Sequence, residues 1–311
     1  MKEEFVFMSK DESQKLYGFR YVTVDKPVAV LQLIHGMDEH VGRYEAFTEY
    51  MADRGFVVYG HDHPGHGKSV SEVSEYGYMG EDPTLQMLWG IHAVRKRAKK
   101  DYPDLPFFML GHSMGSYLLR CYLAKYGDGV TGAVIMGTGY IPLATTAAGL
   151  AFLHSMAAVK GWHYRSEAAR QLTYDSYYKK FDLTGADKEN SWLTRDAASV
   201  EDYYNDEKCG FLFTLNGYRG LLDAVQMSCR KKNVERIPKD LPLYLMSGTD
   251  DPVGGLGTGV TKVYDMMIEA GIKNVKMKLY EGDRHEILHD FHKEEVCREI
   301  SEWMEELAKA N

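Results

Sequence analysis

Short apolar runs alternate with segments of helical periodicity along most of this chain, and this alternation constrains the fold more than any other feature. The runs expected as strands are 28–34, 56–59, 107–110, 133–136, 243–246 and 275–280. The helical patterns lie at 44–51, 84–100, 114–126, 260–269 and 293–308. Strand–helix alternation is typical of βαβ units, so we predict an α/β fold with a mostly parallel central sheet flanked by helices. A β-hairpin over 5–8 and 16–23 is expected to precede it.

The alternation is interrupted once, between about residue 142 and residue 236. This stretch has helical periodicity and many tyrosines but no convincing buried strand, and the alternation then resumes. A sheet that is interrupted and then completed indicates one domain with an insertion. We therefore predict a core in two parts, 1–140 and 238–311, with an inserted helical cap or lid at 141–237.

Composition excludes several classes of protein. The 311 residues include 37 Lys and Arg against 45 Asp and Glu, a net charge of −8, which argues against a nucleic-acid partner because such binding needs a basic face. The 4 cysteines are widely spaced and form no C-x-x-C pair, so we expect reduced thiols rather than a metal or redox motif.

No targeting or membrane-spanning segment is expected either. The first residues carry acids where a signal peptide needs basic residues, and the longest apolar stretch, 143–159, is too short and too polar to span a membrane. We predict a cytoplasmic protein without an integral membrane segment, in contact with lipid only transiently. Its oligomeric state stays unknown.

The sharpest local motif is the pentapeptide GHSMG at 111–115. It follows an expected strand and precedes an expected helix, which is the context that a G-x-S-x-G nucleophile elbow requires. The glycines on both sides remove side chains that would collide in so abrupt a turn. Ser113 is therefore the candidate nucleophile.

A serine needs a base to take its proton and a carboxylate to orient that base. The later strands supply both, since the run 243–253 ends with the adjacent acids Asp250 and Asp251, and the run 275–285 ends with His285. The order serine, acid, histidine is one of the known orders of a catalytic triad. Ligands bind at the carboxyl ends of such strands, which favours His285 as the base.

Three acids compete to orient that histidine. We prefer Asp251 to Asp250 because it directly precedes Pro252 and lies three residues past Gly248. Asp283 is a weaker candidate because it lies only two residues before the histidine.

The oxyanion of a tetrahedral intermediate needs two preorganised amide donors. One candidate is the amide of Met114, directly after the nucleophile. The other is the amide of Met37, in the turn after the strand that ends near His35, where Gly36 allows the backbone to approach closely.

Three segments together resemble the monoacylglycerol lipase and lysophospholipase group of α/β-hydrolases, which also includes the serine aminopeptidases: HGMDEH at 35–40 with Arg43 and Tyr44, DHPGHGKS at 62–69, and GHSMG at 111–115. The resemblance covers nearly the whole core. It implies the α/β-hydrolase fold, a triad of Ser113, Asp251 and His285, and an oxyanion hole of Met37 and Met114. It also implies a carboxylic ester hydrolase that needs no cofactor and no metal.

Two other functions remain to be weighed. His61, His63 and His66 have the H-x-H-x-x-H spacing of metallo-β-lactamase-like zinc hydrolases, but that motif normally has Asp before the third histidine, where this chain has Gly65. The resemblance instead interprets this stretch as a structural turn fixed by Asp62 and its glycines. A catalytically inactive binding module is disfavoured because all three triad residues are present.

The substrate depends mainly on the inserted segment. Leu150, Phe152, Leu153 and Met156 are candidates for an apolar lid over an acyl chain, and plain packing of the cap on the core explains them equally well. We predict a small-molecule ester substrate, a monoacylglycerol or lysophospholipid first and small acyl esters next.

The alternative substrate is an aminoacyl group, as in a serine aminopeptidase of the proline iminopeptidase type. Such an enzyme holds the substrate ammonium with acids of the cap. The acid pairs at 201–202 and 206–207 are candidates, but they are mixed with tyrosines and a lysine and favour a solvated helix face.

Overall fold

The computed structural model of the chain describes residues 1–174 and 176–310. Its centre is an 8-stranded sheet with the strand order β1-β2-β4-β3-β5-β6-β7-β8. The strands are β1 (Lys2–Met8), β2 (Lys15–Tyr21), β3 (Ala29–Ile34), β4 (Phe56–His61), β5 (Phe107–His112), β6 (Gly132–Met136), β7 (Leu243–Gly248) and β8 (Val275–Tyr280). β1 and β2 form the expected antiparallel hairpin and β2 pairs antiparallel with β4, whereas all the other pairs are parallel. The mostly parallel sheet predicted from the alternation is confirmed.

Three strands run further at their carboxyl ends than their apolar patterns. β4 continues to His61, β5 to His112 and β7 to Gly248, because pairing with the neighbouring strand extends past the last apolar residue of each. The backbone hydrogen bonds of a ladder do not depend on the apolar pattern, so the pattern underestimates the length of such strands.

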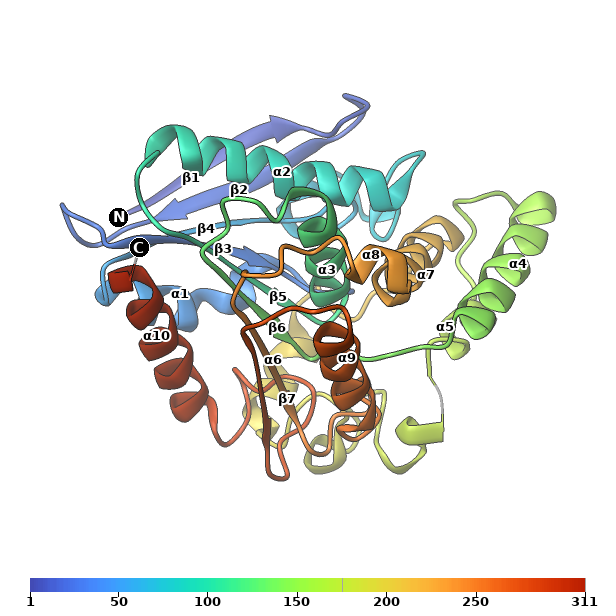
Figure 1. Cartoon of the computed structure of the whole chain (residues 1–311). Helices are drawn as coiled ribbons and strands as arrows, with labels where there is room; N and C mark the ends of the chain where they lie inside the picture. Colours follow the sequence, from blue (N-terminus) through green and yellow to red (C-terminus); the bar gives the residue numbers. More distant parts are fainter. Residues whose placement is uncertain (175, 311) are drawn as a thin grey trace.

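Helices cover both faces of the sheet (Figure 1). One face packs against α1 (Glu45–Asp53) and α10 (Lys293–Ala310), and the other against α2 (Pro83–Asp101), α3 (Met114–Tyr126) and α9 (Thr258–Glu269). Alternate residues of one strand enter the two apolar clusters, as Val30 and Leu31 of β3 do. Burial on both faces is the reason that these strands appear as continuous apolar runs.

The segment between β6 and β7 contributes no strand to the sheet among the residues described. Its α-helices are α4 (Leu143–Lys160), α5 (Glu167–Gln171), α6 (Ala197–Asn205), α7 (Leu215–Cys229) and α8 (Lys231–Val234). The same segment contains the short 3-10 turns η4 (Ser176–Lys180) and η5 (Lys188–Asn190). Three further 3-10 turns lie earlier in the chain, before α2: η1 (Val41–Tyr44), η2 (Gly67–Ser69) and η3 (Val73–Glu75). α7 packs against α2 and α3, so Leu215 and Tyr218 share one apolar cluster with the sheet. The limits of a separate cap at 141–237 therefore stay a prediction.

None of the helices within the described ranges is both long enough and apolar enough to cross a membrane.

Candidate active site

Ser113 lies in the turn between β5 and α3 with φ 54° and ψ −122°. This left-handed φ is strained for a serine, and tight packing holds the turn in place. A Cβ atom at Gly111 would collide with the carbonyl oxygen of Gly115, and one at Gly115 with the carbonyl oxygen of Ile34. Ser113 is partly exposed between buried neighbours. The turn therefore presents the serine hydroxyl at the carboxyl edge of the sheet, as a nucleophile elbow does.

Asp251 and His285 meet at the ends of the last two strands. Oδ1 of Asp251 lies 3.0 Å from Nδ1 of His285, and the carboxylate also accepts hydrogen bonds from the hydroxyl of Ser247 at 2.6 Å and the amide of Val253 at 2.9 Å. Burial favours the neutral acid, but the His285 ring and the hydrogen bonds lower the pKa of Asp251 overall. An ionised carboxylate keeps the proton on Nδ1, which leaves Nε2 of His285 as the basic nitrogen.

The other two acids point elsewhere. The Asp250 side chain is 45 % exposed. Asp283 is buried and lies 2.8 Å from Nδ1 of His292. Of the three acids considered from the sequence, the structure brings Asp251 to His285.

The loop after β3 passes directly over Ser113. A Cβ atom at Gly36 would lie 3.0 Å from Cβ of Ser113, and the Gly36 amide donates to Oε1 of Glu39 at 2.5 Å, which fixes the loop. Met37 follows on this loop. Met114 is the first residue of α3, where an amide has no acceptor within its own helix. Both amides are thus close to the candidate nucleophile in the chain fold, and their role as the oxyanion hole remains a proposal.

Two aromatic rings hold the His285 imidazole, and the sequence interpretation missed both. Trp192, in the inserted segment, stacks on it with 5.2 Å between ring centroids and 25° between planes. The His112 ring lies 4.7 Å from it, between centroids, with 39° between planes, and Nε2 of His112 is 3.2 Å from the carbonyl oxygen of His285. His112 was within reach of the sequence interpretation, because it directly precedes the candidate nucleophile. No local pattern marks Trp192, because its partner lies far along the chain.

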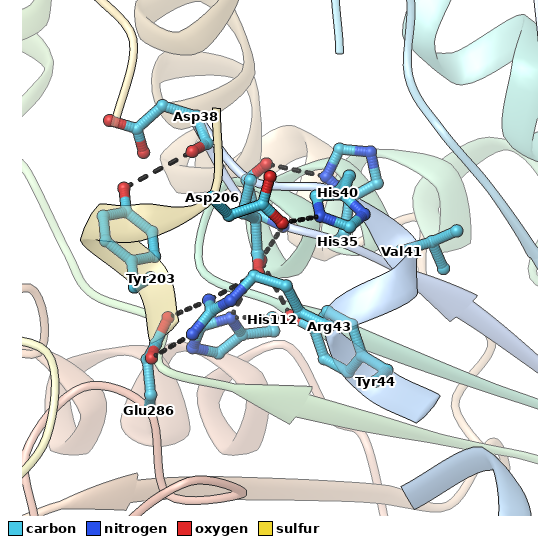
Figure 2. Close-up of polar contacts among 12 residues, drawn as sticks. His35, Asp38, His40, Val41, Arg43, Tyr44, His112, Tyr203, Asp206 and Glu286 are labelled. Atoms are coloured by element: carbon cyan, nitrogen blue, oxygen red, sulfur yellow. Dashed lines mark hydrogen bonds and ion pairs between the residues drawn. The ribbon is translucent and has the colours of Figure 1, made fainter. Parts of the chain in front are cut away.

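A buried ionic network lies behind these loops (Figure 2). Arg43 donates to Oε2 of Glu39 at 3.0 Å and to Oε2 of Glu286 at 2.8 Å. Tyr44 donates to Oε1 of Glu39 at 2.8 Å, and its hydroxyl lies 2.9 Å from Nδ1 of His112. Burial opposes both charges, but the pairing raises the pKa of Arg43 and lowers that of Glu286. The network joins the loop after β3, the nucleophile turn and the loop of His285.

His112 completes the charge balance of this network. Burial lowers its pKa, but hydrogen bonding to Glu39 and the charge of Glu39 raise it overall. The tyrosine hydroxyl already donates to Glu39, so Nδ1 of His112 donates to that hydroxyl, while Nε2 donates to the carbonyl of His285. Both ring nitrogens are thus donors. The two glutamates are balanced by Arg43 and a protonated His112.

The candidate zinc histidines do not form a metal site. His61, His63 and His66 are fully buried, and within the described residues their ring nitrogens do not converge as metal ligands. Burial lowers the pKa of His61 to about 3 and that of His66 to about 4. Asp62 accepts instead from the amides of Val41 and Lys68, at 2.8 and 2.7 Å, which fixes this turn.

The four lid candidates on α4 do not share one environment. Leu153 is buried in the large apolar cluster, and Leu150 and Met156 are partly buried. The Phe152 side chain is 38 % exposed. α4 packs against α7 at the periphery of the molecule (Figure 1).

A parallel sheet with a serine in a strained strand–helix turn, and an aspartate–histidine pair at the following strand ends, defines a serine hydrolase of the α/β-hydrolase class. A family described as serine aminopeptidase, S33, matches residues 25–292. The chain belongs to this family.

Known proteins of similar sequence and structure agree with this class. The chain is 27 % identical to the monoglyceride lipase of Homo sapiens over 301 residues, which cover 94 % of this chain and 88 % of that protein. It is also 27 % identical to an uncharacterised abhydrolase domain-containing protein of Dictyostelium discoideum, of which it spans only 27 %. A thermostable carboxyl esterase from Bacillus coagulans has a TM-score of 0.91 at 28 % identity, with 99 % of each chain covered. The chain is a serine hydrolase of carboxylic esters, and the comparisons give no support to a metallohydrolase.

Proposed function

We propose that this enzyme hydrolyses single-chain lipid esters, of the monoacylglycerol or lysophospholipid kind, with Ser113, His285 and Asp251 as its catalytic triad. The observation that carries the proposal is the contact between Asp251 and Nδ1 of His285, next to the strained turn of Ser113. The names of the related lipases support the lipid substrate.

The reaction follows from this arrangement. Nε2 of His285 accepts the hydroxyl proton as Oγ of Ser113 attacks the ester carbonyl, and Asp251 stabilises the imidazolium. The oxyanion receives hydrogen bonds from the amides of Met37 and Met114. The imidazolium then protonates the leaving alcohol as the ester bond breaks. Water, deprotonated by the same histidine, attacks the acyl-enzyme and releases the acid.

The outer surface of α4 supports contact with lipid. Phe152 and Val159 lie seven residues apart on one face of α4 and are 38 % and 81 % exposed, and exposed apolar side chains on one helix face suit transient docking at a lipid surface. The partly buried Leu150 and Met156 remain the candidates for contact with the acyl chain. The proposed cytoplasmic location rests on the widely spaced, free cysteines.

The aminopeptidase alternative lacks such support. Glu201 forms an ion pair with Lys188 at 2.9 Å near the surface, and Glu207 is exposed. Asp206 pairs with His40 at 2.8 Å instead of standing free for a substrate ammonium. Nothing in the geometry of these acids favours recognition of an amino terminus.

Labelling and substrate series test the proposal. A fluorophosphonate probe is expected to label Ser113 in the folded protein, because it reacts with activated serines. Among p-nitrophenyl esters, medium and long acyl chains are expected to give higher kcat/KM than acetate. Preference for aminoacyl nitroanilides over all esters would contradict the lipid substrate, and absence of labelling would contradict the triad.

A further inference from the structure

A separate polar cluster lies where the loop after β3 meets the inserted segment. His40 comes from that loop, and Asp206 and Cys209 come from the turn after α6. Nε2 of His40 lies 2.8 Å from Oδ2 of Asp206 (Figure 2). The ligand atoms of the three residues all lie within 4.8 Å of one another. In the described part of the chain, this is the one group of three or more His, Cys, Asp or Glu side chains that converges in this way.

The cluster lies where hydrogen bonds to the backbone already join the loop after β3 to the inserted segment. The amide of Gly210 donates to the carbonyl oxygen of Asp38 at 2.9 Å, and the hydroxyl of Tyr203 donates to the same oxygen at 3.4 Å. Asp38 has a left-handed φ of 46° and directly follows Met37, the candidate oxyanion donor. Whatever tightens this junction therefore also restrains the loop over the nucleophile.

The three ligands carry identifiable protons when no ion is bound. Nδ1 of His40 accepts from the amide of Gly42 at 3.2 Å, so Nε2 carries the proton and donates to Asp206. Partial burial opposes ionisation of Asp206, but hydrogen bonds from His40 and the amide of Lys208 lower its pKa overall. Burial raises the pKa of Cys209 although Arg43 opposes the rise, so the thiol is neutral. The cluster thus consists of a neutral imidazole, a carboxylate and a thiol.

A nitrogen, an oxygen and a sulfur ligand suit a borderline cation such as Zn²⁺. Bond lengths of about 2.0 to 2.3 Å place the ligands of a tetrahedral zinc ion about 3.3 to 3.7 Å apart. In the cluster, Nε2 of His40 and Oδ2 of Asp206 are 2.8 Å apart, and no two of the ligand atoms are more than 4.8 Å apart, so modest side-chain movement closes the site. His40 and Asp206 are 16 % and 30 % exposed, which leaves access for the ion and for water as a fourth ligand.

We propose that His40, Asp206 and Cys209 bind one Zn²⁺-like cation that ties the inserted segment to the loop of Met37. On binding, Sγ of Cys209 releases its proton to solvent, and the proton of His40 moves from Nε2 to Nδ1. The amide of Gly42 then donates its hydrogen bond to water instead of to His40. The thiolate and the carboxylate together balance the charge of the ion, so the partly buried site carries no excess charge. The residues proposed for catalysis are not ligands, so the site is distinct from the proposed triad.

Co²⁺ is the probe that tests binding, because a thiolate ligand gives an intense charge-transfer band and a tetrahedral site gives strong visible bands. Titration of the full chain is expected to produce both, with one Co²⁺ per chain, displaced by one Zn²⁺. Cys209→Ser is expected to lose the charge-transfer band and at least tenfold in affinity. Cys297→Ser, which alters another partly buried thiol, is the matched control and is expected to bind as the wild type does.

Further variants separate this site from the triad. A His285→Ala variant is expected to bind Co²⁺ unchanged, so the result does not depend on the proposed function. Loss of binding in that variant, or a charge-transfer band that survives Cys209→Ser, would overturn the site. Asp206→Asn is expected to weaken binding at least tenfold, and an unchanged affinity would exclude the carboxylate as a ligand.

Hydrogen exchange tests whether the bound ion restrains both the inserted segment and the loop after β3. Saturating Zn²⁺ is expected to slow hydrogen exchange in the segment 206–210 and in the loop 36–40 of the wild type, and to leave both unchanged in Cys209→Ser. Equal exchange with and without bound Zn²⁺ in the wild type would disprove the restraint.

Discussion

The sheet edge and the inserted segment meet at His285, and they hold it in different ways. On the side of the sheet, Asp251 is fully buried and bonds Nδ1 at 3.0 Å, with an ionic network behind it. On the side of the insertion, Trp192 contributes a stacked ring but no hydrogen bond to the imidazole among the described contacts. The sheet edge therefore determines the protonation and direction of the base, and the insertion determines what surrounds it. Substitutions on the two sides are expected to differ in size and in kind.

The largest effect is expected at the nucleophile turn. Ser113→Ala removes the attacking oxygen, and kcat is expected to fall about a million-fold. Thermal unfolding should change little, because alanine is no larger than serine. Steady-state ester hydrolysis measures the change in kcat, and a melting curve measures the change in thermal stability. Substantial residual turnover would show that another group attacks the ester.

The next largest effect distinguishes the two adjacent acids. Asp251→Asn is expected to lower kcat about 10⁴-fold, because the amide cannot hold the imidazole in the correct tautomer. Asp250→Asn is the matched control, and we expect it to stay within about threefold of the wild type because its side chain faces solvent. A reversal of the two rates would assign the orienting role to Asp250.

A smaller loss is expected on the side of the insertion. Trp192→Ala removes the ring that stacks on His285, and kcat is expected to fall about ten- to a hundredfold through misplacement of the base. KM for a small acetate ester should change little, because the ring orients the histidine. Trp162→Ala is the control, since that ring contacts His154 instead. Equal effects of both variants would indicate a general loss of packing.

The two regions also differ in how deeply they bury their histidines. The core buries His35, His61, His63 and His66 completely, whereas His154 and His163 of the inserted segment are exposed. Burial lowers the pKa of the four core histidines in the folded state. Below the unfolded value of about 6.5 the unfolded chain therefore binds more protons, and stability falls as pH falls.

A substitution in each region measures this difference. His61→Leu is expected to flatten the decline of unfolding free energy below pH 6.5 by about 1.4 kcal/mol per pH unit, the amount for one proton. His154→Leu, which replaces an exposed histidine of the insertion, is the control variant. Urea unfolding at a series of pH values gives both slopes. Identical slopes for His61→Leu and the wild type would contradict a neutral buried His61.

The smallest effect is expected at the outer surface of the insertion. The double variant Phe152→Ser and Val159→Ser is expected to reduce hydrolysis of monoacylglycerol in vesicles about three- to tenfold through weaker docking. Hydrolysis of a water-soluble ester should not change. Val73→Ser, at another exposed apolar residue, serves as the control. A uniform loss on both substrates would argue against lipid docking by α4.

Much of the core is predictable from sequence because its signals are local. Strands buried on both faces are continuous apolar runs, and the helices between them have their own period, so the order of elements in the core follows directly. The GHSMG motif predicts a strained turn from its own residues and from the strand and helix patterns directly before and after it. The insertion is harder to predict, since its apolar residues serve both packing and surface. Leu153 and Phe152 are adjacent, and one is buried while the other is exposed.

The sequence alone determined the α/β class and the turn of Ser113, because apolar periodicity and glycine spacing act within a few residues. Only the tertiary structure decided which acid reaches His285, which ring stacks on it, and that Arg43 joins three loops. It also brought His40 to Asp206 and Cys209. The physical reason is that hydrogen bonds, ring stacking and metal ligation act over a few ångströms. Residues far apart in the chain meet at that range only when the whole sheet and its insertion have formed.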